Sequence, residues 1–291
     1  MNNTIHIIDA FTNRYFGKGL VSAIAGTLAF LAAIFGIAGH SLAADSADKM
    51  ELYACCFGRS PFAESYAFSD GRKDARIEIA WSFYVARVGT QVTLIDTGFS
   101  DAALAGRFKF AFDHKPAELL AELHIDPATV SRVIITHLHF DHLNGLPLFP
   151  NAQVFMSRRD RDDYLAKKVT GGVVFDQRVA DILADPKRTH LIDGKEMIGD
   201  GFEMEVVGGH TAGSAVVHVH HNGIHYVMTG DECYLTANQK EQRTIGVTAS
   251  RQQNAEFLAR IADPAIVVLP CHDPAIFTRY KPLAPGIVRI F

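Results

Sequence analysis

Three histidines and an aspartate crowd one short stretch of the chain, Thr136-His137-Leu138-His139-Phe140-Asp141-His142. The stretch directly follows the apolar run 133–135, which predicts a buried strand. Because alternate side chains of an extended chain point the same way, His137 and His139 are placed to bind one metal ion. The turn that follows aims Asp141 and His142 at a second ion. A single histidine would be read as an ordinary polar residue, but unpaired imidazoles crowded at a strand end repel when protonated and cost desolvation when neutral.

Three further apolar runs end at residues that can bind a metal. Residues 202–207 precede a glycine-flanked turn that carries His210, residues 224–228 precede Gly230-Asp231, and residues 266–269 precede His272. Sheet proteins of the α/β class gather a site from strand ends at one edge. We therefore expect these three residues to meet the cluster at 137–142.

In combination these motifs resemble the metallo-β-lactamase fold superfamily, in its dinuclear hydrolase branch. The matching elements are the His-x-His-x-Asp-His run at 137–142, the Gly-His-Thr turn at 209–211, Gly230-Asp231, His272, and the early strand 92–98, which contains Asp96. The resemblance implies an α/β fold, an αββα sandwich of the metallo-β-lactamase type.

The resemblance also implies how the ligands divide between two metal ions. His137, His139 and His210 would hold the first ion, Asp141, His142 and His272 the second, and Asp231 would bridge them. Asp96 would lie beneath the site and support a ligand histidine. Two zinc ions per chain are expected, although iron, manganese or cobalt suit the same donors.

Hydrolysis is the chemistry expected of such a centre. Two ions about 3.5–4 Å apart can share a hydroxide and polarise a substrate carbonyl. Asp141 could shuttle a proton as well as bind metal.

Tyr234, three residues after Asp231, narrows the expected substrate. It resembles the tyrosine that N-acyl homoserine lactonases carry at this offset, where its hydroxyl would stabilise an oxyanion or assist the leaving alkoxide. The alternative is an aromatic residue packed under a loop. The resemblance implies opening of the lactone ring of N-acyl homoserine lactones, which is quorum quenching. Alternatives are hydrolysis of another lactone, ester or organophosphate on the same centre, a thioester hydrolase of the glyoxalase II type, or a non-catalytic metal-binding protein.

Segments 51–58 and 81–85 resemble the opening hairpin of lactonase-like members, in which a loop overhangs the active site. The candidates to line an apolar entrance there are Phe57, Phe62, Tyr66 and Phe68. Packing within the sheet is the alternative for each of them.

The N-terminal segment predicts export. Arg14 and Lys18 precede the apolar run 20–38, and small residues follow at 41–44. We expect residues 1–44 to be a secretory signal peptide, and the protein to be periplasmic or secreted. An uncleaved anchor is the alternative, because the run approaches the ~20 residues that span a bilayer. Residues 45–291 are then one hydrolase domain.

Composition limits the partners. A net charge of -4 provides no basic footprint for nucleic acid. We expect a small-molecule lactone or ester as the partner, and membrane contact only through an uncleaved N-terminal segment. A homodimer is an open alternative to a monomer, since lactonase relatives often dimerise. The four cysteines are expected to form no disulfide.

Four helices are predicted between these landmarks, at 102–108, 116–123, 158–167 and 252–261. The charged run in the third favours a solvated face. In the fourth, the spacing of Phe257, Leu258 and Ile261 places them toward the core.

Overall fold

A computed structural model describes residues 50–168 and 171–291. The predicted signal segment 1–44 lies outside the described residues. Within the two described ranges, no helix has the length and apolar character needed to cross a bilayer.

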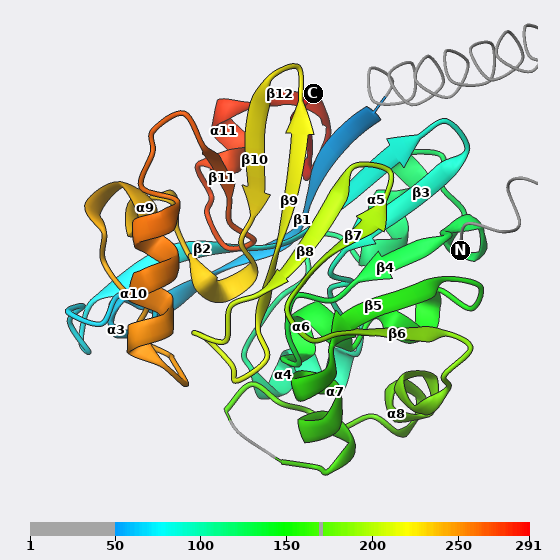
Figure 1. The fold of residues 1–291 in the computed structure, drawn as a ribbon, viewed down its shortest axis with the longest axis horizontal. Helices are drawn as coiled ribbons and strands as arrows, with labels where there is room; N and C mark the ends of the chain where they lie inside the picture. Colours follow the sequence, from blue (N-terminus) through cyan, green and yellow to red (C-terminus); the bar gives the residue numbers. More distant parts are fainter. Residues whose placement is uncertain (1–49, 169–170) are drawn as a thin grey trace, which may run out of the picture. The chain divides into compact units, whose positions relative to one another are not determined.

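Two mixed sheets form the centre of the domain (Figure 1). The first has eight strands in the order β12-β13-β1-β2-β3-β4-β5-β6, and the second has five in the order β11-β10-β9-β8-β7. The first sheet comprises β1 (Met50–Ala63), β2 (Arg76–Val88), β3 (Gln91–Ile95), β4 (Arg132–Ile134), β5 (Gln153–Ser157), β6 (Thr189–Ile192), β12 (Lys281–Ala284) and β13 (Ile287–Arg289). The second comprises β7 (Lys195–Gly199), β8 (Phe202–Val206), β9 (Ala215–His221), β10 (Ile224–Met228) and β11 (Val267–Leu269).

Alternate residues of each strand face different cores. In β1, Leu52 and Ala54 belong to the cluster between the sheets, whereas Cys55 and Phe57 belong to the cluster on the outer face. A period of two with both faces buried is what a strand in the middle of a layered fold requires.

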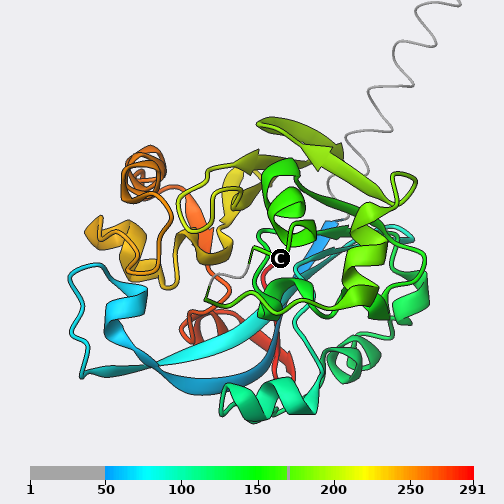
Figure 2. The ribbon, with the colours of Figure 1, turned by 90° about the horizontal axis from the view of Figure 1, so that it is seen from below.

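Helices cover the outer face of each sheet (Figures 1 and 2). The eight-stranded sheet packs against α4 (Ala102–Arg107), α5 (Pro116–Glu122), α7 (Arg158–Leu165) and α8 (Gln177–Ala184). On the five-stranded sheet, Phe257, Leu258 and Ile261 pack on the outward side chains of β9, β10 and β11. The first two of these residues lie in α10 (Arg251–Arg260), which follows α9 (Thr236–Glu241). The predicted αββα sandwich is confirmed.

Most predicted elements are present within a residue or two of their expected bounds. The predictions for α4, α5 and α10 are confirmed, as are the apolar strands β4, β8, β10 and β11. The solvated face predicted for the third helix is partly wrong, because Asp160 of α7 is only 1% exposed.

The hairpin β1–β2 extends beyond the other strands, from the pair Met50–Val88 to the pair Ala63–Arg76. At its tip lies the short helix α3 (Glu64–Ala67). The Gly246 amide donates to the Tyr66 carbonyl (3.0 Å), so the tip is fixed against the loop after α9. The hairpin reaches toward α9 and α10 in Figure 1. Its residues Phe62, Ile79 and Trp81 line the cavity described below.

Candidate metal centre

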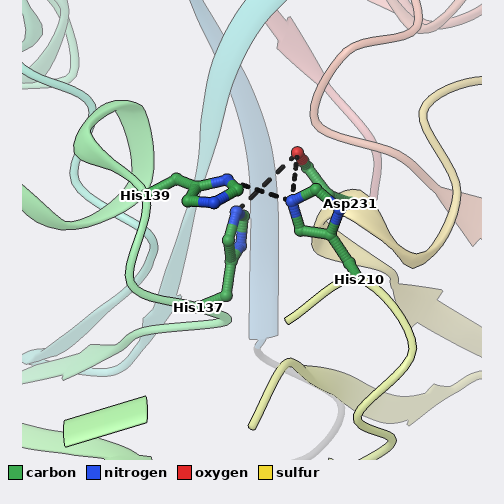
Figure 3. A group of neighbouring side chains, drawn as sticks. All are labelled: His137, His139, His210 and Asp231. Atoms are coloured by element: carbon green, nitrogen blue, oxygen red, sulfur yellow. Dashed lines mark hydrogen bonds and ion pairs between the residues drawn. The ribbon is translucent and has the colours of Figure 1, made fainter. Parts of the chain in front are cut away.

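The structure brings all seven predicted ligand residues together, each no more than 8% exposed. Donor atoms of one group lie within 4.8 Å of one another and come from His137, His139, His210 and Asp231 (Figure 3). A second such group contains Asp141, His142 and His272.

Asp231 lies between the two groups. Its Oδ2 is 3.2 Å from His210 Nε2 and 3.7 Å from His137 Nε2. Its Oδ1 is 3.1 Å from Nε2 of both His142 and His272. Each carboxylate oxygen thus faces one group, which is the arrangement that a bridging ligand requires.

The ligand residues follow the ends of four strands at one edge of the sandwich. His137 and His139 follow β4, and Asp141 and His142 lie in the short helix α6 (Phe140–Leu143). The remaining three, His210, Asp231 and His272, follow β8, β10 and β11.

Gly230 allows two of these strand ends to approach closely. Its φ is +48°, and a Cβ at this position would lie 2.7 Å from Thr136 Oγ1. Glycine tolerates both the conformation and the contact, so Asp231 can lie against the start of the 137–142 run.

Three of the histidines are oriented through their outer ring nitrogen. His142 Nδ1 lies 2.7 Å from Asp96 Oδ2, His210 Nδ1 lies 2.8 Å from the Val247 carbonyl, and His272 Nδ1 lies 2.8 Å from the Ala80 carbonyl. An Nδ1–H that donates to such an acceptor fixes the ring and leaves Nε2 free to bind a metal. Asp96 thus supports a candidate ligand histidine, as expected.

His139 is oriented the other way. Its Nδ1 lies 3.0 Å from His210 Nε2, so this histidine turns Nδ1 toward the centre. Gly172 covers the ring, and a Cβ there would lie 2.9 Å from it. Two ring nitrogens facing each other at this distance need a proton or a cation between them.

Unsatisfied buried atoms provide a test of whether metal ions fit. In the described part of the chain, the buried side-chain atoms without a hydrogen-bond partner include His137 Nε2, His142 Nε2 and Asp231 Oδ1. Such atoms are rare in folded proteins and call for an explanation such as a bound ion. Imidazole nitrogen and carboxylate oxygen are donors that zinc prefers. The two buried clusters are therefore consistent with a dinuclear metal site.

The electrostatics of the first group agree with this conclusion. Burial lowers the pKa of His137 well below its usual value and that of His139 to about 3, so both rings are neutral at neutral pH. Burial acts to raise the pKa of Asp231, but His272 and His142 outweigh it and hold the pKa well below the usual range. Neutral imidazole and ionised carboxylate are the states that bind metal.

The second group holds protons that a metal would displace. Burial acts to lower the pKa of His272, but Asp231 and Asp141 outweigh it and raise the pKa to about 10. Without a cation, this imidazole carries the positive charge that the two carboxylates require. Metal binding here releases that proton.

Tyr234 lies beside the centre, where the sequence predicts it. Its ring stacks on His272, with centroids 5.4 Å apart, and meets His210 edge-on at 5.8 Å. Burial and the nearby Asp231 raise the pKa of Tyr234 well above its usual value. The side chain is therefore a neutral phenol that can donate a hydrogen bond.

Two buried carboxylates that sequence analysis missed hold the ligand loops. Glu232 accepts hydrogen bonds from the amides of Gly209 and His210, both at 2.9 Å. Asp160 accepts from the amides of Leu138 (3.1 Å) and Gly213 (2.8 Å) and so ties the 137–142 run to the 208–214 turn. Neither residue gave a signal, because Asp160 lies in a charged run and Glu232 follows Asp231 with no motif of its own.

A cavity of about 430 Å³ opens onto the centre at His139, Asp141, Asp231, Tyr234 and His272. Aromatic and aliphatic side chains form most of its wall, namely those of Phe62, Tyr66, Ile79, Trp81, Phe108 and Phe140.

Two of the four predicted entrance residues, Phe62 and Tyr66, line this cavity. The prediction for the other two is wrong. Phe57 packs edge-on against Phe99 in the outer core, and Phe68 is buried in a small cluster under the hairpin tip. Neighbouring strand positions point to opposite faces, and the sequence did not show which face of β1 Phe57 occupies. Phe68 follows α3 in a loop, and the sequence did not show the path of that loop.

Residues 78–272 match the sequence profile of the metallo-beta-lactamase superfamily, and the chain belongs to this family. With its buried histidine and aspartate clusters, it is a metal-dependent hydrolase of that superfamily.

Individual relatives are distant. A protein from Mycobacterium bovis named a probable metallo-hydrolase is 25% identical over 233 residues, covering 64% of this chain and 72% of its own. The N-acyl homoserine lactonase AttM of Azorhizobium caulinodans is 30% identical over 182 residues, covering 56% of this chain and 65% of its own.

Among solved structures, that of AidC, a dizinc quorum-quenching lactonase in complex with a product, superimposes with a TM-score of 0.61. The match covers 83% of this chain and 94% of AidC at 18% identity, and it shows a shared fold.

Proposed function

We propose that this protein opens the lactone ring of N-acyl homoserine lactones and so silences a quorum signal. The observation that carries the proposal is the position of Tyr234, a buried neutral phenol at the junction of the candidate metal centre and an apolar cavity. Similarity to AttM and the fold shared with AidC support the same substrate class.

The residues that would hold the two ions are those of the two clusters. His137, His139 and His210 would bind the first ion, Asp141, His142 and His272 the second, and Asp231 both. When bound, two zinc ions supply Lewis acidity and an activated water, and iron, manganese or cobalt could replace them.

Tyr234 and Asp141 would handle the charge and the proton of ring opening. The Tyr234 hydroxyl would donate to the oxyanion that forms at the lactone carbonyl, or to the ring oxygen as it leaves. Asp141 Oδ2 lies 3.2 Å from His142 Nε2 and 3.4 Å from His272 Nε2, and the residue lines the cavity. It would accept a proton from the attacking water and return it to the leaving oxygen.

The cavity wall would bind the acyl chain. The rings of Trp81 and Phe140 pack with their centroids 5.9 Å apart. Together with Phe62 they would form an apolar surface that excludes water from the reacting carbonyl. We further propose that residues 1–44 direct export, so that the enzyme meets its substrate in the periplasm or outside the cell.

Ring opening of short- and long-chain N-acyl homoserine lactones by the zinc-loaded protein tests this proposal. Asp231→Ala should abolish activity, and Tyr234→Phe should lower kcat by on the order of 10²-fold with a smaller change in KM. Tyr226→Phe, on the sheet away from the centre, is the matched control and should match the wild type.

Two outcomes would contradict the proposal. Zinc-loaded wild-type protein that opens no acyl homoserine lactone, yet cleaves another lactone, an ester or a phosphotriester, would assign a different substrate to the same centre. Equal activity of Tyr234→Phe and Tyr226→Phe would show that the Tyr234 hydroxyl takes no part in ring opening.

A further inference from the structure

Another group of histidines lies on the outer face of the five-stranded sheet. His218 and His220 belong to β9 and His225 to β10, near the turn that joins these strands. Asp231 follows the opposite end of β10. The strand neighbours Val219 and Tyr226 pack between the sheets, so the three histidines point away from that core.

Only part of this outer face is covered. α10 packs over Val216 and Val227 and leaves the end near the β9–β10 turn open. His218 is buried, His225 is half-buried and His220 is exposed. A ligand from solvent can therefore reach the group on the side of His220.

His225 contacts both of the other imidazoles. His225 is the direct cross-strand partner of His220, and their rings stack with centroids 4.3 Å apart. His218 precedes His220 by two residues on the same face, and its Nδ1 lies 3.0 Å from His225 Nε2.

The spacing of the two facing nitrogens suits a metal ion. Two ligand nitrogens at about 2.0–2.1 Å from one ion, at a right angle, lie ~2.9 Å apart. Square-planar or tetragonal coordination, which has this angle, is typical of Cu²⁺ and Ni²⁺ with nitrogen donors.

A neighbouring carboxylate favours the tautomer of His218 that can bind a metal. His218 Nε2 lies 3.0 Å from Glu205 Oε2, and a proton on Nε2 that donates to this carboxylate leaves Nδ1 free to act as a ligand. The tautomer of His225 that carries its proton on Nδ1 leaves Nε2, which already faces His218 Nδ1, free to bind the ion.

The charged groups around the cluster already have partners. Arg260 from α10 pairs with Glu205 at 2.6 Å, and Lys195 from β7 pairs with Glu203 at 2.9 Å. Each cation is thereby balanced by a carboxylate on the same face.

We infer that His218 and His225 form an additional two-histidine binding site for a late transition metal ion, with water completing the coordination from the exposed side. This site is separate from the hydrolase centre, and its existence does not depend on the substrate proposed above. It would bind Ni²⁺ or Cu²⁺ in preference to zinc, because zinc favours tetrahedral coordination.

Equilibrium dialysis of the untagged, zinc-loaded full chain against Ni²⁺ tests this inference, with nickel and zinc both counted by mass spectrometry. We expect one Ni²⁺ per chain that His225→Phe weakens by more than tenfold, because phenylalanine keeps the ring stacked on His220 but removes its nitrogens. His190→Phe, at an exposed histidine of β6, is the matched control and should bind as the wild type does. Zinc content should be unchanged in every variant.

The inference is overturned if the wild type binds no Ni²⁺ beyond its zinc, or if His225→Phe binds it as tightly as His190→Phe.

Discussion

The carboxylate of Glu232 holds the turn that presents His210, and replacing it with glutamine tests that role. The side chain is fully buried. Its Oε1 accepts from the amides of Gly209 and His210, both at 2.9 Å, and from Ser214 Oγ at 2.5 Å. Its Oε2 accepts from Asn254 Nδ2 at 2.9 Å.

Glutamine has nearly the same shape but cannot accept all four hydrogen bonds. If its carbonyl oxygen takes the place of Oε1, its NH₂ group faces the NH₂ group of Asn254. Asn254 is not free to turn, because its Oδ1 accepts from the Ile245 amide at 3.1 Å. One hydrogen bond is lost, a buried donor is left unpaired, and the remaining bonds lose their charge assistance. The free energy of unfolding should fall by about 1–3 kcal/mol.

Zinc affinity should fall as well, since His210 loses the support of its backbone. Removing a group that orients a ligand typically costs on the order of 10–100-fold in metal affinity. Urea unfolding measures the first effect, and competition for zinc with a chelator measures the second. Glu241→Gln, whose side chain is 55% exposed, is the control. Equal stability and equal zinc affinity of Glu232→Gln and Glu241→Gln would refute this reasoning.

Two further predictions concern buried titratable groups. Burial raises the pKa of Asp160 to about 7, and the hydrogen bond from Thr211, with those from Leu138 and Gly213, only partly opposes this. The folded protein therefore binds this proton more tightly than the unfolded chain, so Asp160 makes the free energy of unfolding fall as pH rises from about 4 through 7. With Asp160→Asn, the free energy of unfolding measured in urea should depend less on pH over this range. The same pH dependence in Asp160→Asn and in the exposed control Asp162→Asn would contradict this prediction. The four cysteines are all buried and unpaired, and burial raises the pKa of Cys271 to about 12. A thiol reagent should therefore label none in the native protein and four after unfolding, and rapid labelling of the native protein would contradict this.

The candidate ligands could be predicted from sequence because the relevant signals are local. Four of them lie within 137–142, and the others each follow an apolar run. Strand ends that share one edge of a sandwich bring such residues together, and the structure places them so. The inward face of α10 followed from an equally local pattern.

The groups that hold the centre could not be predicted, because their role depends on contacts far along the chain. Asp160 reaches Gly213 across 53 positions, and Glu232 reaches Gly209 across 23. A charged run on a helix predicts a solvent-exposed face, and only the folded structure shows which carboxylate points into the protein. Which of Phe57 and Phe62 lines the cavity could not be predicted either, because the register of the strand decides which face each side chain occupies.

Anomalous diffraction at the zinc edge, from crystals of the zinc-loaded protein, tests the two-ion centre most directly. We predict two peaks on either side of the Asp231 carboxylate. One should lie about 2.0–2.1 Å from His137 Nε2, His139 Nδ1 and His210 Nε2, and the other at a similar distance from His142 Nε2 and His272 Nε2. No peak at this position, or zinc bound only elsewhere on the protein, would contradict the account.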